Sequence, residues 1–120
     1  RACDMRRELG LEVQQFLAHV ALLGSEFPFS ALIERTEQRG VTAAQLERVF
    51  AFVGSHCHDW HDIRTGEALD VGSLNLYHVN SWLIKPATNR PANDVDSCAF
   101  VELLAAGEQD PDWFCSHWWG

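Results

Sequence analysis

The chain has 120 residues, a formal net charge of −8, 47% hydrophobic residues and 22% charged residues. These values are typical of one folded, soluble domain and exclude a disordered chain. The acidic balance disfavours nucleic acid as a partner, and no apolar run approaches the roughly 18 residues that a membrane-spanning helix needs, so we expect neither nucleic-acid binding nor membrane insertion.

Cysteine usage indicates an intracellular protein. The four cysteines, Cys3, Cys57, Cys98 and Cys115, are widely spaced without a C-x-x-C pair, and residues 1–8 lack the apolar core of a signal peptide. Reduced thiols in an intracellular compartment, with the cytoplasm as the simplest choice, are therefore expected. Position 1 is not a methionine, which indicates a processed or trimmed piece.

Apolar residues at helical spacing predict two helices before residue 41. Residues 4–23 carry leucine, valine or phenylalanine every three or four positions, and Gly24 follows, where the C-terminus of a helix would suit it. A shorter helix is predicted from about residue 28 to residue 39, with Gly40 as its stop.

The third predicted helix has the strongest start signal in the chain. Thr42 can accept a hydrogen bond from the Gln45 amide while the Gln45 side chain reaches back, and Val41 can pack on Leu46. Gly54 is the expected end of this helix. Its predicted buried face consists of Leu46, Val49, Phe50 and Val53.

A loop and a fourth helix are predicted next. Residues 55–72 are polar and rich in turn formers, with one turn at residues 62–66. Residues 74–84 regain helical spacing, and Pro86 limits the helix at the residue before it.

A second loop and a last helix complete the helical part. Residues 87–95 predict the loop, and Asp96 or Ser97 can cap a helix that Gly107 closes. The sequence therefore predicts a mainly α fold, a small bundle of about five helices over residues 1–112.

The C-terminal segment, residues 113–120, reads as a single strand-like segment. It holds three tryptophans and a phenylalanine, more aromatic surface than a free chain end leaves in water, and no other convincing strand can pair with its backbone. We expect it to pack against a protein partner or a missing downstream domain. The candidate interaction residues are Trp113, Phe114, His117, Trp118 and Trp119.

The densest group of metal-ligand types follows the third helix. It consists of His56, Cys57, His58 and His61, whose imidazoles and thiol suit zinc or copper. A closed tetrahedral site usually takes two separated pairs, and no second pair of equal quality exists; the possible remote partners are His78, Cys98 and His117. The interpretation we favour is a solvated turn whose histidines suit the C-terminal end of the helix dipole, so no cofactor is expected, and zinc is the candidate only if a metal site forms.

No catalytic residue is predicted. Each thiol can be paired with some imidazole, so many nucleophile–base pairs can be drawn, and none is accompanied by a Gly-flanked elbow or an oxyanion loop. The phosphate-binding motifs G-x-x-x-x-G-K-[ST] and G-x-G-x-x-G are also missing from the sequence.

Two stretches carry a family resemblance. They are NLYHVNSWLIKPAT at residues 75–88, and SCAFVELL at residues 97–104 running on to WFCSHWWG at residues 113–120. Together they resemble a large, poorly characterised family of protist proteins that place a lead-in helix before an F-x-S-H-W-W-G strand. That strand is similar to the opening strand of TIR-like, flavodoxin-type α/β domains.

The resemblance covers residues 73–120 and has limits. The family usually has valine where Cys115 stands, and the chain stops at Gly120, where a TIR-like domain would begin. The catalytic glutamate of a TIR-type NAD hydrolase would lie beyond that point. The resemblance thus implies a truncated TIR-like domain starting at residue 113, without any transferable catalytic residue.

Three functions are consistent with these observations. The leading one is a non-enzymatic protein-interaction or structural domain, docked in a larger assembly that covers the terminal tryptophans. The first alternative is the N-terminal part of a TIR-like hydrolase or signalling protein. The second is a metal-binding module at His56, Cys57, His58 and His61.

Overall fold

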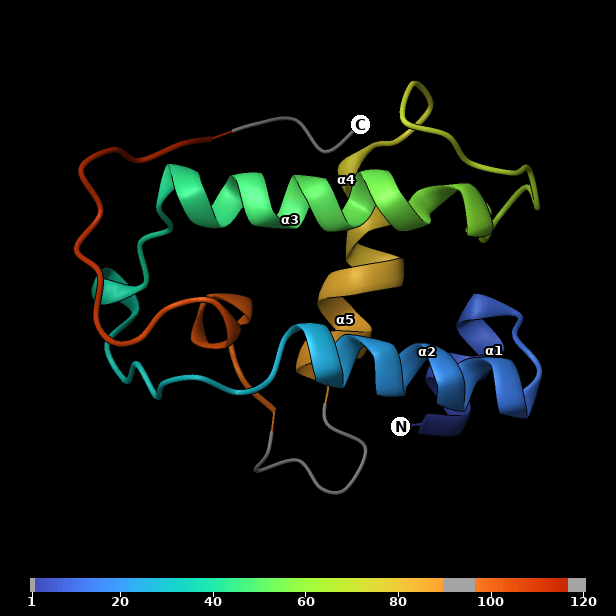
Figure 1. Cartoon of the computed structure of the whole chain (residues 1–120), viewed down its shortest axis with the longest axis horizontal. Coiled ribbons are helices and arrows are strands. Elements are labelled where there is room, and N and C mark those ends of the chain that lie inside the picture. The colour runs from blue at the N-terminus through green and yellow to red at the C-terminus, as the bar shows by residue number, and fades with distance from the viewer. Residues whose placement is uncertain (1, 90–96, 117–120) are drawn as a thin grey trace.

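The protein is described from a computed structural model, which defines residues 2–89 and 97–116 (Figure 1). The helical elements are α1 (Ala2–Leu9), α2 (Val13–Glu26), η1 (Thr36–Gln38), α3 (Ala43–His56), η2 (Cys57–Asp59), α4 (Leu76–Val79), η3 (Asn80–Ile84), α5 (Lys85–Thr88) and η5 (Phe100–Leu103). Within those residues there is no β-sheet, only two isolated bridges. The predicted mainly helical fold is confirmed.

The helices form two long elements joined by a transverse column. Figure 1 shows α2 and α3 at opposite sides of the molecule, with the continuous column α4–η3–α5 running between them and α1 beside the start of α2. None of the helices in the described ranges has the length and apolar character needed to cross a membrane.

The single helix predicted for residues 4–23 is wrong, because the chain breaks at Gly10. Gly10 has φ = +66°, a backbone conformation that glycine adopts without the steric cost of a side chain. Its N–H donates to the Arg7 carbonyl, and the Leu11 N–H donates to the Arg6 carbonyl, both at 3.2 Å. This pair of bonds is the Schellman motif, which ends α1 and lets α2 start anew at residue 13.

The helices predicted for residues 28–39 and 96–107 are also wrong within the described residues, and the buried residue Glu102 explains the first of these errors. Glu102 is 2% exposed, and its carboxylate accepts the N–H groups of Ile33 at 2.6 Å and Ala99 at 2.8 Å. Its carbonyl accepts the amides of Ser30 and Ala31. The bonds from Ser30, Ala31 and Ile33 are long-range and satisfy backbone groups that a helix over residues 28–39 would otherwise pair, so only the short turn η1 forms there. The second segment keeps only the short turn η5.

Helix α3 starts as predicted, and two residues of its predicted face, Val49 and Val53, are buried. The Gln45 N–H donates to the Thr42 hydroxyl at 3.1 Å, and the Thr42 N–H donates to the Gln45 side chain at 2.9 Å, so the capping box is confirmed. The predicted end at Gly54 is wrong, since the helix continues to residue 56. Of the predicted face, Leu46 and Phe50 are exposed. The buried residues of α3 are Val49, Phe52 and Val53.

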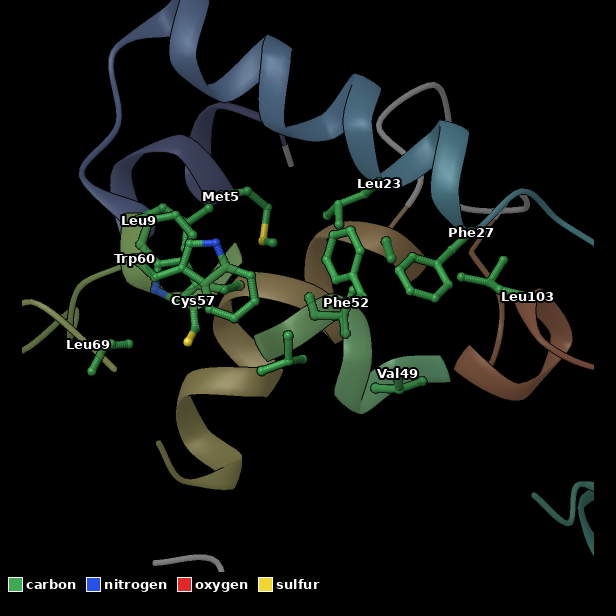
Figure 2. Close-up of a cluster of buried hydrophobic side chains, with 14 of the residues drawn as sticks. Met5, Leu9, Leu23, Phe27, Val49, Phe52, Cys57, Trp60, Leu69 and Leu103 are labelled. Carbon is green, nitrogen blue, oxygen red and sulfur yellow. The ribbon is translucent and has the colours of Figure 1, made fainter. Parts of the chain in front are cut away.

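The main hydrophobic core lies between α2, α3 and the transverse column (Figure 2). Phe27 and Phe52 meet edge to face in it, with ring centroids 5.0 Å apart. Cys57 is fully buried there as a small apolar residue. The fifteen buried residues of the main core are Met5, Leu9, Phe16, Leu23, Phe27, Val49, Phe52, Val53, Cys57, Trp60, Leu69, Trp82, Leu83, Ala87 and Leu103.

The transverse column passes through Pro86, so the predicted helix end before this residue is wrong. Residues 80–84 form a π-helical turn in which the Lys85 N–H donates to the Asn80 carbonyl, five residues back. Pro86 has no N–H to give to the Trp82 carbonyl, four residues back. His19 on α2 supplies that hydrogen bond instead, with its Nε2 2.8 Å from the Trp82 oxygen. The helix therefore continues to residue 88.

The terminal strand is not found in the described part of the chain. Residues 113–116 are irregular and exposed, and residues 117–120 lie outside the described residues.

Candidate functional site

Two cavities open beside Trp82, with volumes of about 380 Å³ and about 400 Å³. The residues lining the first cavity include Glu8, Asp62, Arg64, Tyr77, His78 and Trp82. Those lining the second include His19, His56, Asp59, Trp60, His61 and Trp82. Both volumes lie in the range of small-molecule sites.

Trp82 lines both cavities and is held in place by several contacts. Its side chain is 3% exposed, and its indole N–H donates to the His61 carbonyl at 2.8 Å. The indole stacks on Trp60, with ring centroids 5.8 Å apart and 3° between the planes. The rings of His19 and His61 both meet it edge to face. These contacts hold the Trp82 ring in one orientation.

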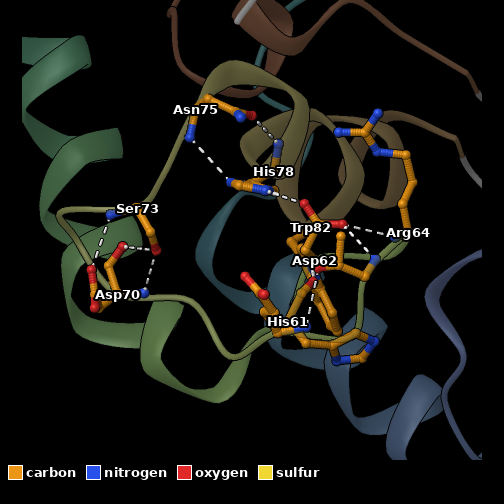
Figure 3. A network of polar contacts seen from close by, with 10 residues as sticks. His61, Asp62, Arg64, Asp70, Ser73, Asn75, His78 and Trp82 are labelled. Atoms are coloured by element: carbon orange, nitrogen blue, oxygen red, sulfur yellow. Dashed lines mark hydrogen bonds and ion pairs between the residues drawn. The ribbon is translucent and has the colours of Figure 1, made fainter.

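The first cavity contains a histidine–carboxylate pair. The Nε2 atom of His78 lies 2.8 Å from the Oδ2 atom of Asp62 (Figure 3). The N–H of Asn75 donates to the Nδ1 atom of His78 at 3.1 Å, so Nδ1 is an acceptor and the proton of the neutral ring lies on Nε2. Both ring nitrogens are thus engaged within the protein. The pair acts as a structural clamp between α4 and the preceding loop.

Asp62 organises that loop. Its Oδ1 atom accepts the amides of Arg64 at 2.8 Å and Thr65 at 3.0 Å, and Gly66, with φ = +75°, donates its N–H to the Asp62 carbonyl. The hydrogen bond from His78 and then the backbone amides hold the pKa of the Asp62 carboxyl well below its usual range. The turn predicted at residues 62–66 is confirmed.

The second cavity brings together three imidazoles from separate parts of the chain. His19 comes from α2, His56 from the end of α3, and His61 from the turn after η2. His19 donates Nε2–H to the Trp82 carbonyl, because a carbonyl can only accept. Burial, together with the charge of His56, lowers the pKa of His19, which favours its neutral form.

Of the four predicted metal ligands, His56 and His61 line the second cavity, whereas Cys57 and His58 lie elsewhere. His56 packs on Phe52, with ring centroids 4.4 Å apart, whereas Cys57 is in the core. His58 is exposed and lies 3.6 Å from Asp59.

His61, the fourth predicted ligand, lines the second cavity. Of the remote partners, His78 is bound to Asp62, Cys98 packs at the edge of the main core, and His117 lies outside the described residues. Across residues 2–89 and 97–116, no three His, Cys, Asp or Glu side chains are grouped so as to hold a metal ion.

The aromatic end of the chain is exposed as far as it is described. Trp113 is 86% exposed and Phe114 is 95% exposed, whereas Trp60 and Trp82 are buried. The other predicted interaction residues, His117, Trp118 and Trp119, lie outside the described residues.

Sequence reasoning singled out His56, His61 and His78, which line the cavities, but missed His19 and Trp82. His19 and Trp82 are 63 positions apart, and no local pattern joins them. The Asn75–His78 capping box did leave a signal, since a capping residue three positions before a side chain able to reach back marks a helix start. That signal would have placed His78 at a loop–helix junction.

Comparisons with protein-family models, with curated proteins and with solved structures gave no match to this chain.

Proposed function

We propose that this chain is a non-enzymatic protein-interaction or structural domain that docks into a larger assembly through its aromatic C-terminal segment. The observation that carries the proposal is the exposure of two adjacent aromatic side chains, Trp113 at 86% and Phe114 at 95%. Tryptophan is the residue type most enriched at the energetic centres of protein interfaces.

The energy at stake is large enough to drive docking. An aromatic side chain can bury about 150–250 Å², and about 25 cal/mol per Å² gives roughly 4–6 kcal/mol for each ring before the costs of association. The other two described tryptophans, Trp60 and Trp82, are already buried in the core. The C-terminal segment is therefore the place where a partner gains most by covering this protein.

The histidine–carboxylate pair supports a structural function. A general base needs a ring nitrogen that faces the substrate, whereas His78 uses Nδ1 for the Asn75 amide and Nε2 for Asp62. The arrangement ties α4 to the loop at residues 62–66 and leaves this ring no nitrogen for proton transfer.

The compartment forms part of the proposal. Cys57 and Cys115 are free thiols, which supports an intracellular and, in our proposal, cytoplasmic protein. The partner is then an intracellular protein.

A second candidate is the N-terminal part of a TIR-like hydrolase or signalling protein. The SHWWG pentapeptide at residues 116–120 favours it, through the resemblance described above. In that case a downstream domain of the same polypeptide covers Trp113 and Phe114.

Sizing of the native complex tests the proposal. Tagged chain in extract of the source cells should migrate well above 13.6 kDa in size-exclusion chromatography with light scattering, and the double variant Trp113→Ser/Phe114→Ser should return to monomer mass. Phe29→Ser is the matched control, because Phe29 is a half-exposed aromatic residue outside the segment. A monomeric wild-type chain, or an equal effect of Phe29→Ser, would contradict the proposal.

A further inference from the structure

We propose that the docking surface of this chain has two parts, and that its occupant is a protein face with an apolar centre and a basic rim. The first part is the aromatic C-terminal segment, and the second is an apolar stripe on the outer side of α3. The two-part surface rests on the docking function proposed above, which it makes specific.

The stripe of α3 consists of Leu46 and Phe50, which are 44% and 67% exposed. The face of α3 that packs in the core carries other residues, namely Val49, Phe52 and Val53. Residues four positions apart project from the same side of a helix, so the two side chains of the stripe are open to one partner.

The chain enters the C-terminal segment beside the first turn of α3, because Gln109 ties it there. The Gly40 N–H donates to the Gln109 carbonyl at 2.7 Å, and the Gln109 side-chain amide donates to the Gly40 carbonyl at 2.8 Å. The side chains of Gln109 and Gln45, which lies in the first turn of α3, exchange hydrogen bonds of 2.9 Å and 3.0 Å. Figure 1 shows the red stretch that leads to the C-terminus passing the start of α3.

This attachment leaves little freedom at the base of the segment. A Cβ atom added to Gly40 would lie 2.8 Å from the Gln109 carbonyl oxygen and 3.0 Å from the Pro111 nitrogen, so the two backbones are in direct contact. Trp113 follows Pro111 by two residues, a span of at most about 7 Å. An aromatic ring held so close to α3 has already lost part of its positional freedom, which favours binding.

The surroundings of the segment are acidic. Glu108, Asp110 and Asp112 are exposed, and among the described residues none of them takes part in an ion pair. Two basic side chains of neighbouring elements are turned to the protein itself, since Arg39 and Arg48 each donate to a backbone carbonyl. The acidic charges around the segment are therefore left for a partner to compensate.

These charges select the class of occupant. Lysine or arginine around an apolar patch complements exposed carboxylates beside aromatic rings, and such complementarity speeds encounter and excludes wrong partners. A bilayer that contains anionic lipids would be repelled by the same carboxylates. A second copy of this chain brings the same net charge of −8. The occupant is therefore a different protein, one with a basic rim.

Photo-crosslinking in extract of the source cells tests the two-part surface. A benzophenone-bearing amino acid replaces Phe50 in one experiment and Leu17, which is 59% exposed on α2, in the control. Position 50 should give an adduct of the same mass as position 114, and position 17 should not. An adduct from position 114 without one from position 50 would overturn the two-part surface and leave docking through the segment standing. The lack of any adduct from position 114 would contradict the docking function itself.

Charge reversal tests the basic rim. Asp110→Lys/Asp112→Lys should lower the yield of the adduct from position 50 roughly three- to tenfold, the size expected for two exposed charge pairs. Glu12→Lys/Glu67→Lys is the matched control, because it changes the net charge equally at exposed positions outside the surface. Raising NaCl from about 0.05 M to about 0.5 M should also lower the wild-type yield. Equal yields from the two double variants, or a yield that salt does not lower, would refute the basic rim.

Two further controls keep these outcomes decisive. Asp110 adjoins the attachment to α3, so Asp110→Lys/Asp112→Lys is to be checked by circular dichroism; if it unfolds, Asp112→Lys is compared with Glu67→Lys. Vesicles of phosphatidylcholine and phosphatidylserine test a membrane as the occupant, and we expect no binding to them. Vesicle binding that Trp113→Ser/Phe114→Ser abolishes would overturn the assignment to a protein.

Discussion

The imidazole of His19 donates to the Trp82 carbonyl across 2.8 Å, and the residue four positions after Trp82 is Pro86, which has no N–H to offer this carbonyl. A side chain on α2 thus replaces a backbone hydrogen bond of the transverse column. The same contact sets the position of Trp82, which separates the His78–Asp62 clamp from the three-imidazole cavity.

His19→Leu is expected to lower the free energy of unfolding by about 1–3 kcal/mol, because the buried Trp82 carbonyl loses its donor. Urea denaturation followed by circular dichroism measures this. The cost should be smaller in a Pro86→Ala background, where residue 86 regains an N–H. An unchanged cost in that background would show that Pro86 and His19 are not coupled through this carbonyl.

The stability should fall on mild acidification through His19. Its folded-state pKa lies below the ordinary value of about 6.5, so its contribution is complete above that pH and is lost as the pH falls towards the folded-state pKa. The variant His19→Gln can still donate to Trp82 without titrating. We expect a flatter dependence of unfolding free energy between about pH 7 and pH 5 for this variant than for wild type. Parallel curves would argue against the prediction.

Asp62→Ala should release the loop that Asp62 organises. The amides of Arg64 and Thr65 lose their acceptor, so their hydrogen exchange should accelerate, and Asp59→Ala, in the adjacent turn, should leave it unchanged. Because the folded-state pKa of Asp62 lies well below its usual range, the loop is held above about pH 4 and loosens as the pH falls further. Equal exchange in both variants would contradict this.

Glu102→Ala should be the most destabilising single change proposed for this chain. It leaves the amides of Ile33 and Ala99 without their acceptor in a buried site, at a cost of about 2–6 kcal/mol for the pair. Thermal and urea unfolding measure the loss, with the exposed Glu34→Ala as control. A loss below about 1 kcal/mol would mean that the extended segment does not depend on Glu102.

Two local sequence signals predicted local structure correctly. The capping box of Thr42 and Gln45 and the turn at residues 62–66 depend on neighbours a few positions apart, and both are found in the structure. Periodicity failed where a distant group decides the backbone. Glu102 holds residues 30–33 in an extended path, and no pattern within those residues reveals it.

The candidate sites also combine residues that a local pattern indicates with residues that only the fold brings together. The histidine-rich turn is visible in the sequence, and its His56 and His61 line the second cavity, whereas the third imidazole, His19, and the neighbouring Trp82 come from distant helices. Such pairings over 63 positions require the fold. The aromatic segment was singled out from its composition, and the part of it that the structure describes, residues 113–116, is exposed and irregular instead of a strand.

Photo-crosslinking in the source cells tests the docking claim most directly. A benzophenone-bearing amino acid replaces Phe114 in one experiment and Phe29, the half-exposed aromatic control, in the other. The account predicts one discrete protein adduct from position 114 that position 29 does not give, and unlabelled wild-type chain should suppress it while Trp113→Ser does not. No adduct from position 114, or the same adducts from both positions, would contradict the account.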